Sequence, residues 1–164
     1  MTKQKIIFLD IDGPMIPGRA YHMPTQTKGI VKTFDPCAVG LLNKICSKSG
    51  WRIVLHSSWI QILGGEETHS HCISQGIPTE HFHDNAWCDE NVGWRYTRVA
   101  KWLNENPDTT HYFILDDEPY RWAMEKNDLE LHPKDIDKHL ILVDFEDGIL
   151  TSTMNKISGG NWKV

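Results

Sequence analysis

The feature that most constrains the fold is an apolar segment that ends in two aspartates. Residues 5–12 read Lys-Ile-Ile-Phe-Leu-Asp-Ile-Asp, so a short run typical of a fully buried strand leads directly to Asp10 and Asp12. Carboxylates are rarely buried unless they are paired or hold a cation. The segment therefore predicts a strand inside a sheet whose end carries a functional site.

Three further segments are predicted to be buried strands. They are WRIVLHSS, HYFILDDE and HLILVDFEDG, at residues 51–58, 111–118 and 139–148. Helical patterns separate these strands, and such alternation is typical of a mainly parallel sheet covered by helices on both faces. We therefore expect one α/β domain over residues 1–164, built as a three-layer sandwich.

A helix is predicted between Asp35, which with the following proline is suited to a helix N-terminus, and Gly50, which is suited to a C-cap. The other predicted helices lie at residues 93–107 and from about residue 151. Residues 14–34 are expected to form an irregular loop or a small hairpin. Residues 59–92 are expected to form short helical pieces and loops.

Several of the predicted strands end in polar residues. Ligands of parallel sheets sit beyond the carboxyl ends of the strands, so these residues are expected to converge: Asp10, Asp12, Ser57, Ser58, Asp116 and Asp117. Four carboxylates would repel one another, and a hard cation such as Mg²⁺ is the simplest reason to bring them together. A serine hydroxyl and a basic side chain from the intervening helix would then suit a phosphoryl group.

Two carboxylates two residues apart can divide the work of phosphate-ester hydrolysis. One can attack phosphorus and form an aspartyl phosphate. The other can protonate the leaving oxygen and then activate water. Asp10 and Asp12 fit this division of labour.

Four segments in this order carry a family resemblance. FLDIDG, IVLHSS, a basic helix and FILDD resemble the four motifs of the haloacid dehalogenase (HAD) superfamily of phosphohydrolases. The longer segments FDPCAVGLLNKICSKSGWRIVLHSSW, WRYTRVAKWL and LVDFEDGILT resemble one branch, the HAD domains of Swiss Army Knife RNA-repair proteins. The resemblance implies a Rossmannoid sheet, an Mg²⁺ cofactor and a phosphoaspartate mechanism.

The resemblance also implies roles for the four aspartates. Asp10 would be the nucleophile and a metal ligand, and Asp12 the general acid/base that offers its backbone carbonyl to the metal. Asp117 or Asp116 would complete the metal site, directly or through water.

The remaining motif residues would bind the phosphoryl group. Ser57 is the first choice in its motif and Ser58 the nearby alternative. Among the basic residues of the helix, Arg95 takes the place of the family's Lys or Arg. Arg98, one turn further along the same face, is the alternative, and Lys101 is a third choice.

One residue departs from the general HAD pattern, and the lengths of two stretches bear on the substrate. Pro14 stands where the superfamily usually has Thr or Val, a position that shapes the turn rather than the chemistry. The stretches from Gly13 to Asp35 and from Lys101 to Asp116 are too short to hold a substantial cap domain. An open, capless site favours a phosphate carried by a large molecule. The first expectation is a phosphatase for a nucleic-acid end or a nucleotide, and the second is a phosphatase for phosphoproteins, including phosphotyrosine. The alternative is a module that binds phosphate without turnover.

Composition limits the partners further. The net charge of −5 and the sequence pI of about 6.0 argue against a protein that coats nucleic acid through a broad basic surface. No apolar run approaches the roughly 20 residues of a membrane span, and no signal peptide is recognisable. We therefore expect a cytoplasmic protein without a membrane partner, whose four cysteines are reduced thiols.

A histidine-rich stretch offers a second candidate site. HSHC and EHFHD bring together five potential zinc ligands, His69, His71, Cys72, His81 and His83. They either bind Zn²⁺ or belong to a solvated connection, and the spacing matches no standard zinc finger.

The tryptophans divide between core and site. Trp51 and Trp102 occupy core-like positions in their predicted strand and helix. Trp59 and Trp122 follow motif residues and could line the open site, where an aromatic surface suits either a base or a phosphotyrosine ring.

Overall fold

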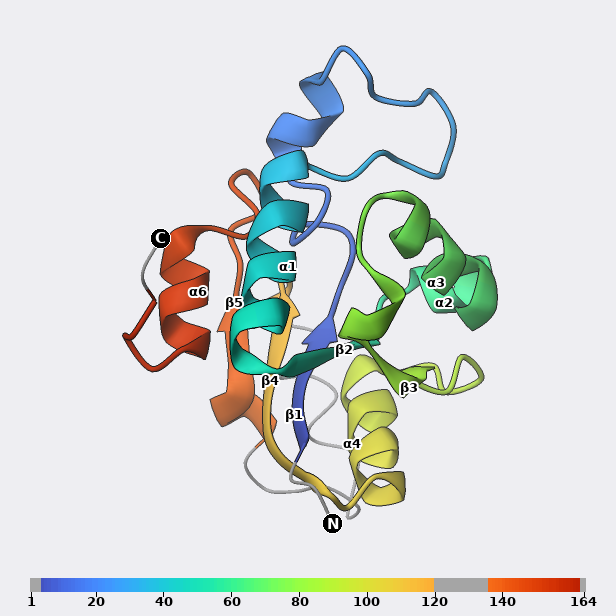
Figure 1. The fold of residues 1–164 in the computed structure, drawn as a ribbon. Coiled ribbons are helices and arrows are strands. Elements are labelled where there is room, and N and C mark those ends of the chain that lie inside the picture. The colour runs from blue at the N-terminus through green and yellow to red at the C-terminus, as the bar shows by residue number, and fades with distance from the viewer. Residues whose placement is uncertain (1–3, 120–135, 163–164) are drawn as a thin grey trace.

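The sheet positions everything else in the molecule. The structure is a computed structural model that describes residues 4–119 and 136–162. Within these residues, five parallel strands pair in the order β3-β2-β1-β4-β5 (Figure 1). They are β1 (Gln4–Leu9), β2 (Trp51–Leu55), β3 (Phe82–Trp87), β4 (Thr109–Asp116) and β5 (Leu140–Leu142). The predicted α/β class with a mainly parallel sheet is confirmed.

Helices cover both faces of this sheet. The α-helices are α1 (Pro36–Ser49), α2 (Trp59–Ile62), α3 (Gly65–Ser74), α4 (Arg95–Glu105) and α6 (Thr151–Ile157), and the 3₁₀ helices are η1 (Gly18–His22), η2 (Thr79–His81) and η4 (Ile136–His139). Every helix in the described part of the chain is too short or too polar to traverse a lipid bilayer.

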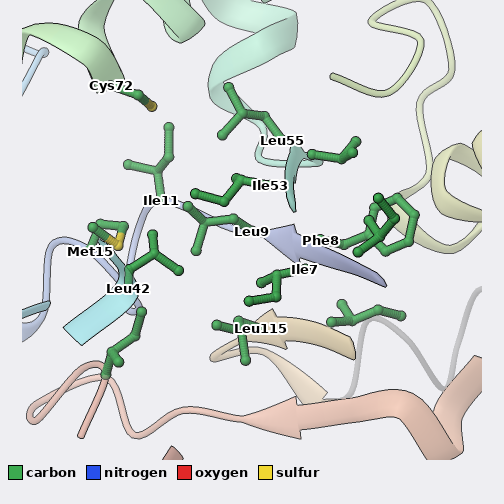
Figure 2. Packing of buried hydrophobic residues seen from close by; sticks show 14 of the residues in the cluster. Ile7, Phe8, Leu9, Ile11, Met15, Leu42, Ile53, Leu55, Cys72 and Leu115 are labelled. Atoms are coloured by element: carbon green, nitrogen blue, oxygen red, sulfur yellow. The ribbon is translucent and has the colours of Figure 1, made fainter. Parts of the chain in front are cut away.

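The central strand shows how the two helical layers are held. Phe8 of β1 packs edge-on against Trp102 of α4, with ring centroids 5.3 Å apart. Side chains alternate along a strand, so Ile7 and Leu9 point to the opposite face, where Leu42 of α1 lies (Figure 2). All of these side chains are almost completely buried. The apolar run of β1 is thus buried on both sides, as its sequence predicts.

The caps of α1 are those that the sequence predicts. The Asp35 carboxylate accepts a hydrogen bond from the backbone N–H of Cys37 at 2.8 Å, and Gly50 ends the helix with a φ of 68°. Asp35 also accepts a hydrogen bond from Arg19 Nε at 2.6 Å. This second contact ties the loop that precedes α1 to the helix.

The prediction for residues 59–92 was wrong in one respect, because this stretch contains a strand. β3 pairs with β2 at one edge of the sheet and is only partly buried, with Asp84 and Asn85 exposed. Polar side chains are tolerated there because an edge strand has only one strand neighbour. At the other edge, β5 has three residues, so the strand predicted over 139–148 is much shorter.

The two places where a cap domain could be inserted are both described and both carry none. Residues 13–34 form a loop with the short helix η1, and only residues 106–108 separate α4 from β4. The carboxyl edge of the sheet is therefore not covered by a cap at either insertion point.

Replacing Ile7 by alanine tests the role of the central strand. Ile7→Ala should lower the free energy of unfolding by about 2–5 kcal/mol, because the site is fully buried and cannot collapse easily. Ile30 is 82% exposed, so the matched Ile30→Ala variant should change it by less than about 0.5 kcal/mol. Urea unfolding of both variants measures the difference; similar losses would contradict the assignment of β1 to the core.

Candidate active site

The candidate site lies where β1, β2 and β4 end. The backbone N–H of Asp10 donates to the carbonyl of Leu115 at 3.0 Å, and the N–H of His56 donates to the carbonyl of Leu9 at 3.1 Å. The hydrogen bonding of the sheet therefore continues into the first residues after the strands. It brings Asp10, Ser57 and Asp116 to one edge, and all three are fully buried.

Arg95 joins two of these carboxyl groups. Its Nη1 donates to Asp10 Oδ2 at 2.8 Å and to Asp116 Oδ2 at 2.5 Å, and its Nη2 lies 3.9 Å from Glu118 Oε2. Arg95 is the first residue of α4, so the helix begins over the carboxyl edge. Burial works to lower the pKa of this guanidinium, but Asp10 and Asp116 more than offset it and raise the pKa above its ordinary value.

The alternative cations lie elsewhere. Arg98 is also buried, and its Nη1 donates to the backbone carbonyl of Ser57 at 3.2 Å. Lys101 pairs with Asp89 at 2.5 Å on the exposed side of α4. Of the three basic residues singled out in the sequence, Arg95 therefore contacts the converging carboxylates, Arg98 supports the backbone beside them and Lys101 lies away from them.

The two serines differ in their surroundings. The Ser57 hydroxyl is hydrogen-bonded to Asp10 and accepts a bond from the backbone N–H of Trp59 at 3.4 Å. Ser58 is only partly buried and is the N-cap residue of α2. Ser57 thus belongs to the carboxylate cluster, whereas Ser58 begins the next helix.

Asp12 lies at the outer side of this cluster, where an indole holds it. The Trp59 Nε1–H donates to Asp12 Oδ2 at 2.9 Å, and the Trp59 ring stacks on His71 with centroids 5.6 Å apart. Trp59 therefore contacts a motif residue directly, a contact that the sequence signalled only by placing a tryptophan next to Ser58.

A glycine brings Asp117 close to the turn after β1. Gly13 has a φ of 77°, and a Cβ at this position would lie 2.6 Å from Asp117 Cγ. A larger residue would be strained and would displace Asp117. The carbonyl of Pro14 accepts a hydrogen bond from the N–H of Ile149 at 3.3 Å, which ties this turn to the segment after β5.

Burial and mutual repulsion disturb the titration of the cluster. Burial, and then the Asp116 charge, raise the pKa of Asp10 to about 7, against the opposing effects of Arg95 and Ser57. The same two causes raise the pKa of Asp117 to about 6. Burial lowers the pKa of the neighbouring His56 to about 3, so His56 adds no positive charge near neutral pH.

The cluster fits a hard divalent cation. Asp10, Asp116 and Asp117 each offer a carboxylate oxygen, and these oxygens lie within 4.8 Å of one another. Oxygen donors are the ligands that Mg²⁺ prefers. Burial and the charge of Asp116 raise the pKa values of Asp10 and Asp117, and a bound cation would counter both effects by favouring the ionised carboxylates.

The histidine-rich stretch does not come together as a metal site. The carboxylate trio is the only grouping of three or more potential ligands found among residues 4–119 and 136–162. The His69 ring packs on Phe82, and His81 hydrogen-bonds with Ser47 and Asn43. The zinc alternative is not supported, because each ring is directed to a different neighbour.

The remaining tryptophan predictions have mixed outcomes. Trp51 and Trp102 are buried in the core as expected. Trp59 is also buried, although it reaches the site through its indole nitrogen. Trp122 lies outside the described residues.

Comparison with known families agrees with this geometry. A family model described as the HAD domain in Swiss Army Knife RNA repair proteins matches residues 6–154. The chain belongs to this family. No individual curated protein matches it significantly. This HAD domain is therefore a member of a hydrolase superfamily of phosphatase type, and the match includes every motif residue from Asp10 to Asp117.

The buried charge of Asp10 should make stability depend on pH. A folded-state pKa of about 7, against 3.8 for the ordinary group, means that the folded protein keeps a proton that the unfolded chain releases. Stability from this group is therefore lost as the pH rises from about 4 through 7. Asp10→Asn removes the effect, so its stability relative to wild type should increase by a few kcal/mol between pH 5 and pH 8.

Denaturant unfolding with a chelator present measures this difference. Asp89→Asn is the matched control, because Lys101 and Asn91 hold the pKa of the partly exposed Asp89 below its usual range and its charge does not change between the two pH values. A constant difference between Asp10→Asn and wild type at both pH values would refute the raised pKa.

Proposed function

We propose that this HAD domain is an Mg²⁺-dependent phosphomonoesterase that forms an aspartyl phosphate on Asp10. The observation that carries the proposal is the contact of Arg95 with Asp10 and Asp116 at the edge where Ser57 also lies. A carboxylate nucleophile needs a cation and hydrogen-bond donors around the anionic group that it attacks. These residues supply both.

The first step would be attack by an Asp10 oxygen on phosphorus. The bond between phosphorus and the substrate oxygen breaks, and Asp12 gives that oxygen its proton. Asp12 is suited to this role because it is partly exposed at the outer side of the cluster, and the hydrogen bond from Trp59 orients its carboxyl group.

The second step would release phosphate. Asp12, now ionised, accepts a proton from water as the water oxygen attacks phosphorus. The bond between phosphorus and Asp10 breaks, and Asp10 is restored as a carboxylate. Ser57 and Arg95 would donate hydrogen bonds to the phosphoryl oxygens in both steps.

The metal would be held by Asp10, Asp116 and Asp117. When bound, Mg²⁺ supplies positive charge that neutralises these carboxylates and stabilises the phosphoryl oxygens. The described geometry supports this assignment through the closely spaced oxygens of the three side chains.

The substrate class that fits best is a nucleic-acid end or a nucleotide. The carboxyl edge has no cap at the usual insertion points, so a phosphate on a large molecule can reach it. The matched family is named for RNA repair proteins, which supports a nucleic-acid substrate. The net charge of −5 fits a site for an end better than a surface that tracks a long polyanion.

Hydrolysis assays test this function. Wild-type protein with Mg²⁺ should release phosphate from 3′- or 5′-phosphorylated oligonucleotides or nucleotides faster than from phosphopeptides. Asp10→Asn should lower the rate of phosphate release at least about a thousandfold, because it removes the nucleophile, while Asp89→Asn should retain the wild-type rate. Rates that are unchanged by Asp10→Asn or by a chelator would rule out the proposal, and preference for phosphopeptides would overturn the substrate class.

Trp59→Phe tests the role of Asp12. Loss of the indole N–H should slow hydrolysis about tenfold for alkyl phosphates, whose leaving oxygen needs a proton, because a hydrogen bond to a charged group contributes about 1.5–3 kcal/mol. An activated aryl phosphate, whose leaving group needs little protonation, should be affected much less.

The matched control for this variant is Trp102→Phe. Trp102 is another buried tryptophan, and its Nε1–H donates to the carbonyl of Asn85 at 3.1 Å, away from Asp12. The Trp102→Phe variant should be less stable than wild type, but the ratio of its rates on alkyl and activated aryl phosphates should not change. If Trp59→Phe slows both classes of phosphate equally, the indole only maintains the fold.

A further inference from the structure

Two aromatic rings are exposed beside the candidate site. Tyr21 of η1 is 44% exposed and Phe145, in the loop after β5, is 41% exposed. Their ring centroids lie 6.4 Å apart with an interplanar angle of 34°. Two loops that are far apart in the sequence thus bring their rings into contact while both rings stay accessible to solvent, and folding alone does not require that arrangement.

Backbone hydrogen bonds join the two loops to each other and to the turn after β1. The N–H of Gly18 donates to the carbonyl of Phe145 at 2.7 Å, and the N–H of Ile149 donates to the carbonyl of Pro14 at 3.3 Å. Figure 1 shows the loop that contains η1 beyond the carboxyl ends of β1 and β4. The two loops that carry the rings are therefore held beyond the carboxyl ends of these strands.

The electrostatics of Tyr21 agree with this placement. Partial burial raises the pKa of its phenol, and the carboxylates of Asp12 and Asp117 raise it further. The ring therefore lies within electrostatic reach of the outer side of the carboxylate cluster.

The charges around the two rings limit what can bind there. Lys32 Nζ lies 5.9 Å from the centroid of the Tyr21 ring and donates to the carbonyl of Thr27 at 2.9 Å. Phe145 is flanked by Asp144 and Glu146, which are both exposed. The exposed acids beside Phe145 oppose a strand that carries a phosphate at every residue, whereas a ligand that presents a single planar group is repelled much less.

We infer that Tyr21 and Phe145 form a stacking shelf for the base of the nucleotide whose phosphate is hydrolysed at Asp10. The substrate is then a nucleoside phosphate, free or at a chain end, and it is recognised through that one nucleotide. The inference rests on the proposed function for the position of the phosphate. Every base has a face that stacks on an aromatic ring, so the shelf tolerates any base.

Paired substrates with and without a base test the shelf. We would measure kcat/KM with Mg²⁺ for adenosine 3′- and 5′-monophosphate and for the corresponding ribose phosphates that lack the base. Tyr21→Ala and Phe145→Ala should each lose about tenfold on the adenosine substrates, mainly through KM, because stacking contributes to binding. Neither variant should change the rate on ribose phosphates, and Tyr21→Phe, which keeps the ring, should behave as wild type.

Strand length and peptide substrates give two further comparisons. Extending the mononucleotide to a short oligonucleotide should leave KM nearly unchanged, since recognition is limited to one nucleotide. Equal losses on substrates with and without the base, or a large gain with strand length, would overturn the shelf. If a phosphotyrosine peptide is preferred over the nucleotides, and Tyr21→Ala lowers its kcat/KM as much as it lowers theirs, the rings bind a peptide instead.

A binding measurement separates failure of the shelf from failure of the proposed function. Equilibrium dialysis of adenosine monophosphate with the Asp10→Asn protein, alone and combined with Tyr21→Ala, needs no turnover. Binding that weakens about tenfold on loss of the ring supports the shelf even if the wild-type protein hydrolyses none of the substrates, in which case only the proposed function fails. If Tyr21→Ala leaves the affinity for adenosine monophosphate unchanged, the shelf is overturned, whatever the activity of the wild-type protein.

Discussion

The structure depends on the burial of two neighbouring carboxylates against one guanidinium. Asp10 comes directly after β1 and Asp116 is the last residue of the adjacent β4; both have no exposed surface and accept hydrogen bonds from Arg95. Removing charged groups from water is costly unless they are paired, so the parallel pairing of β1 with β4 and the start of α4 at Arg95 have to occur together. The positions of these elements are coupled through this contact.

A second set of contacts surrounds this pair and faces outward. Asp12 is oriented by Trp59, and the Gly13 turn allows Asp117 to approach closely. The loops around Tyr21 and Phe145 rest on the same turn. The molecule therefore has a buried charged pair, Asp10 and Asp116, next to partly exposed carboxylates at the carboxyl edge of the sheet.

The fold was predictable where burial leaves a strong pattern. β1, β2 and β4 are apolar runs because they lie at the centre of the sheet, and α1 was recognisable from Asp35 and Gly50 at its ends. The edge strand β3 was missed because Asp84 and Asn85 face solvent and interrupt the apolar pattern. In the site, the sequence left Arg95 and Arg98 as alternatives, because both lie on one face of a helix, one turn apart.

By itself, the sequence determined the α/β class, the parallel central strands and the set of polar residues at their carboxyl ends. Short apolar runs, the helical patterns between them and the polar residues that follow each run are all readable from neighbouring positions in the chain. Only the tertiary structure decided which partner each of these residues meets. It directs Arg95 to the carboxylates and Arg98 to a backbone carbonyl, joins Trp59 to Asp12, and brings Tyr21 to Phe145. Such contacts join residues from separate loops and helices, and they depend on how those elements pack, for which no short stretch of sequence carries a signal.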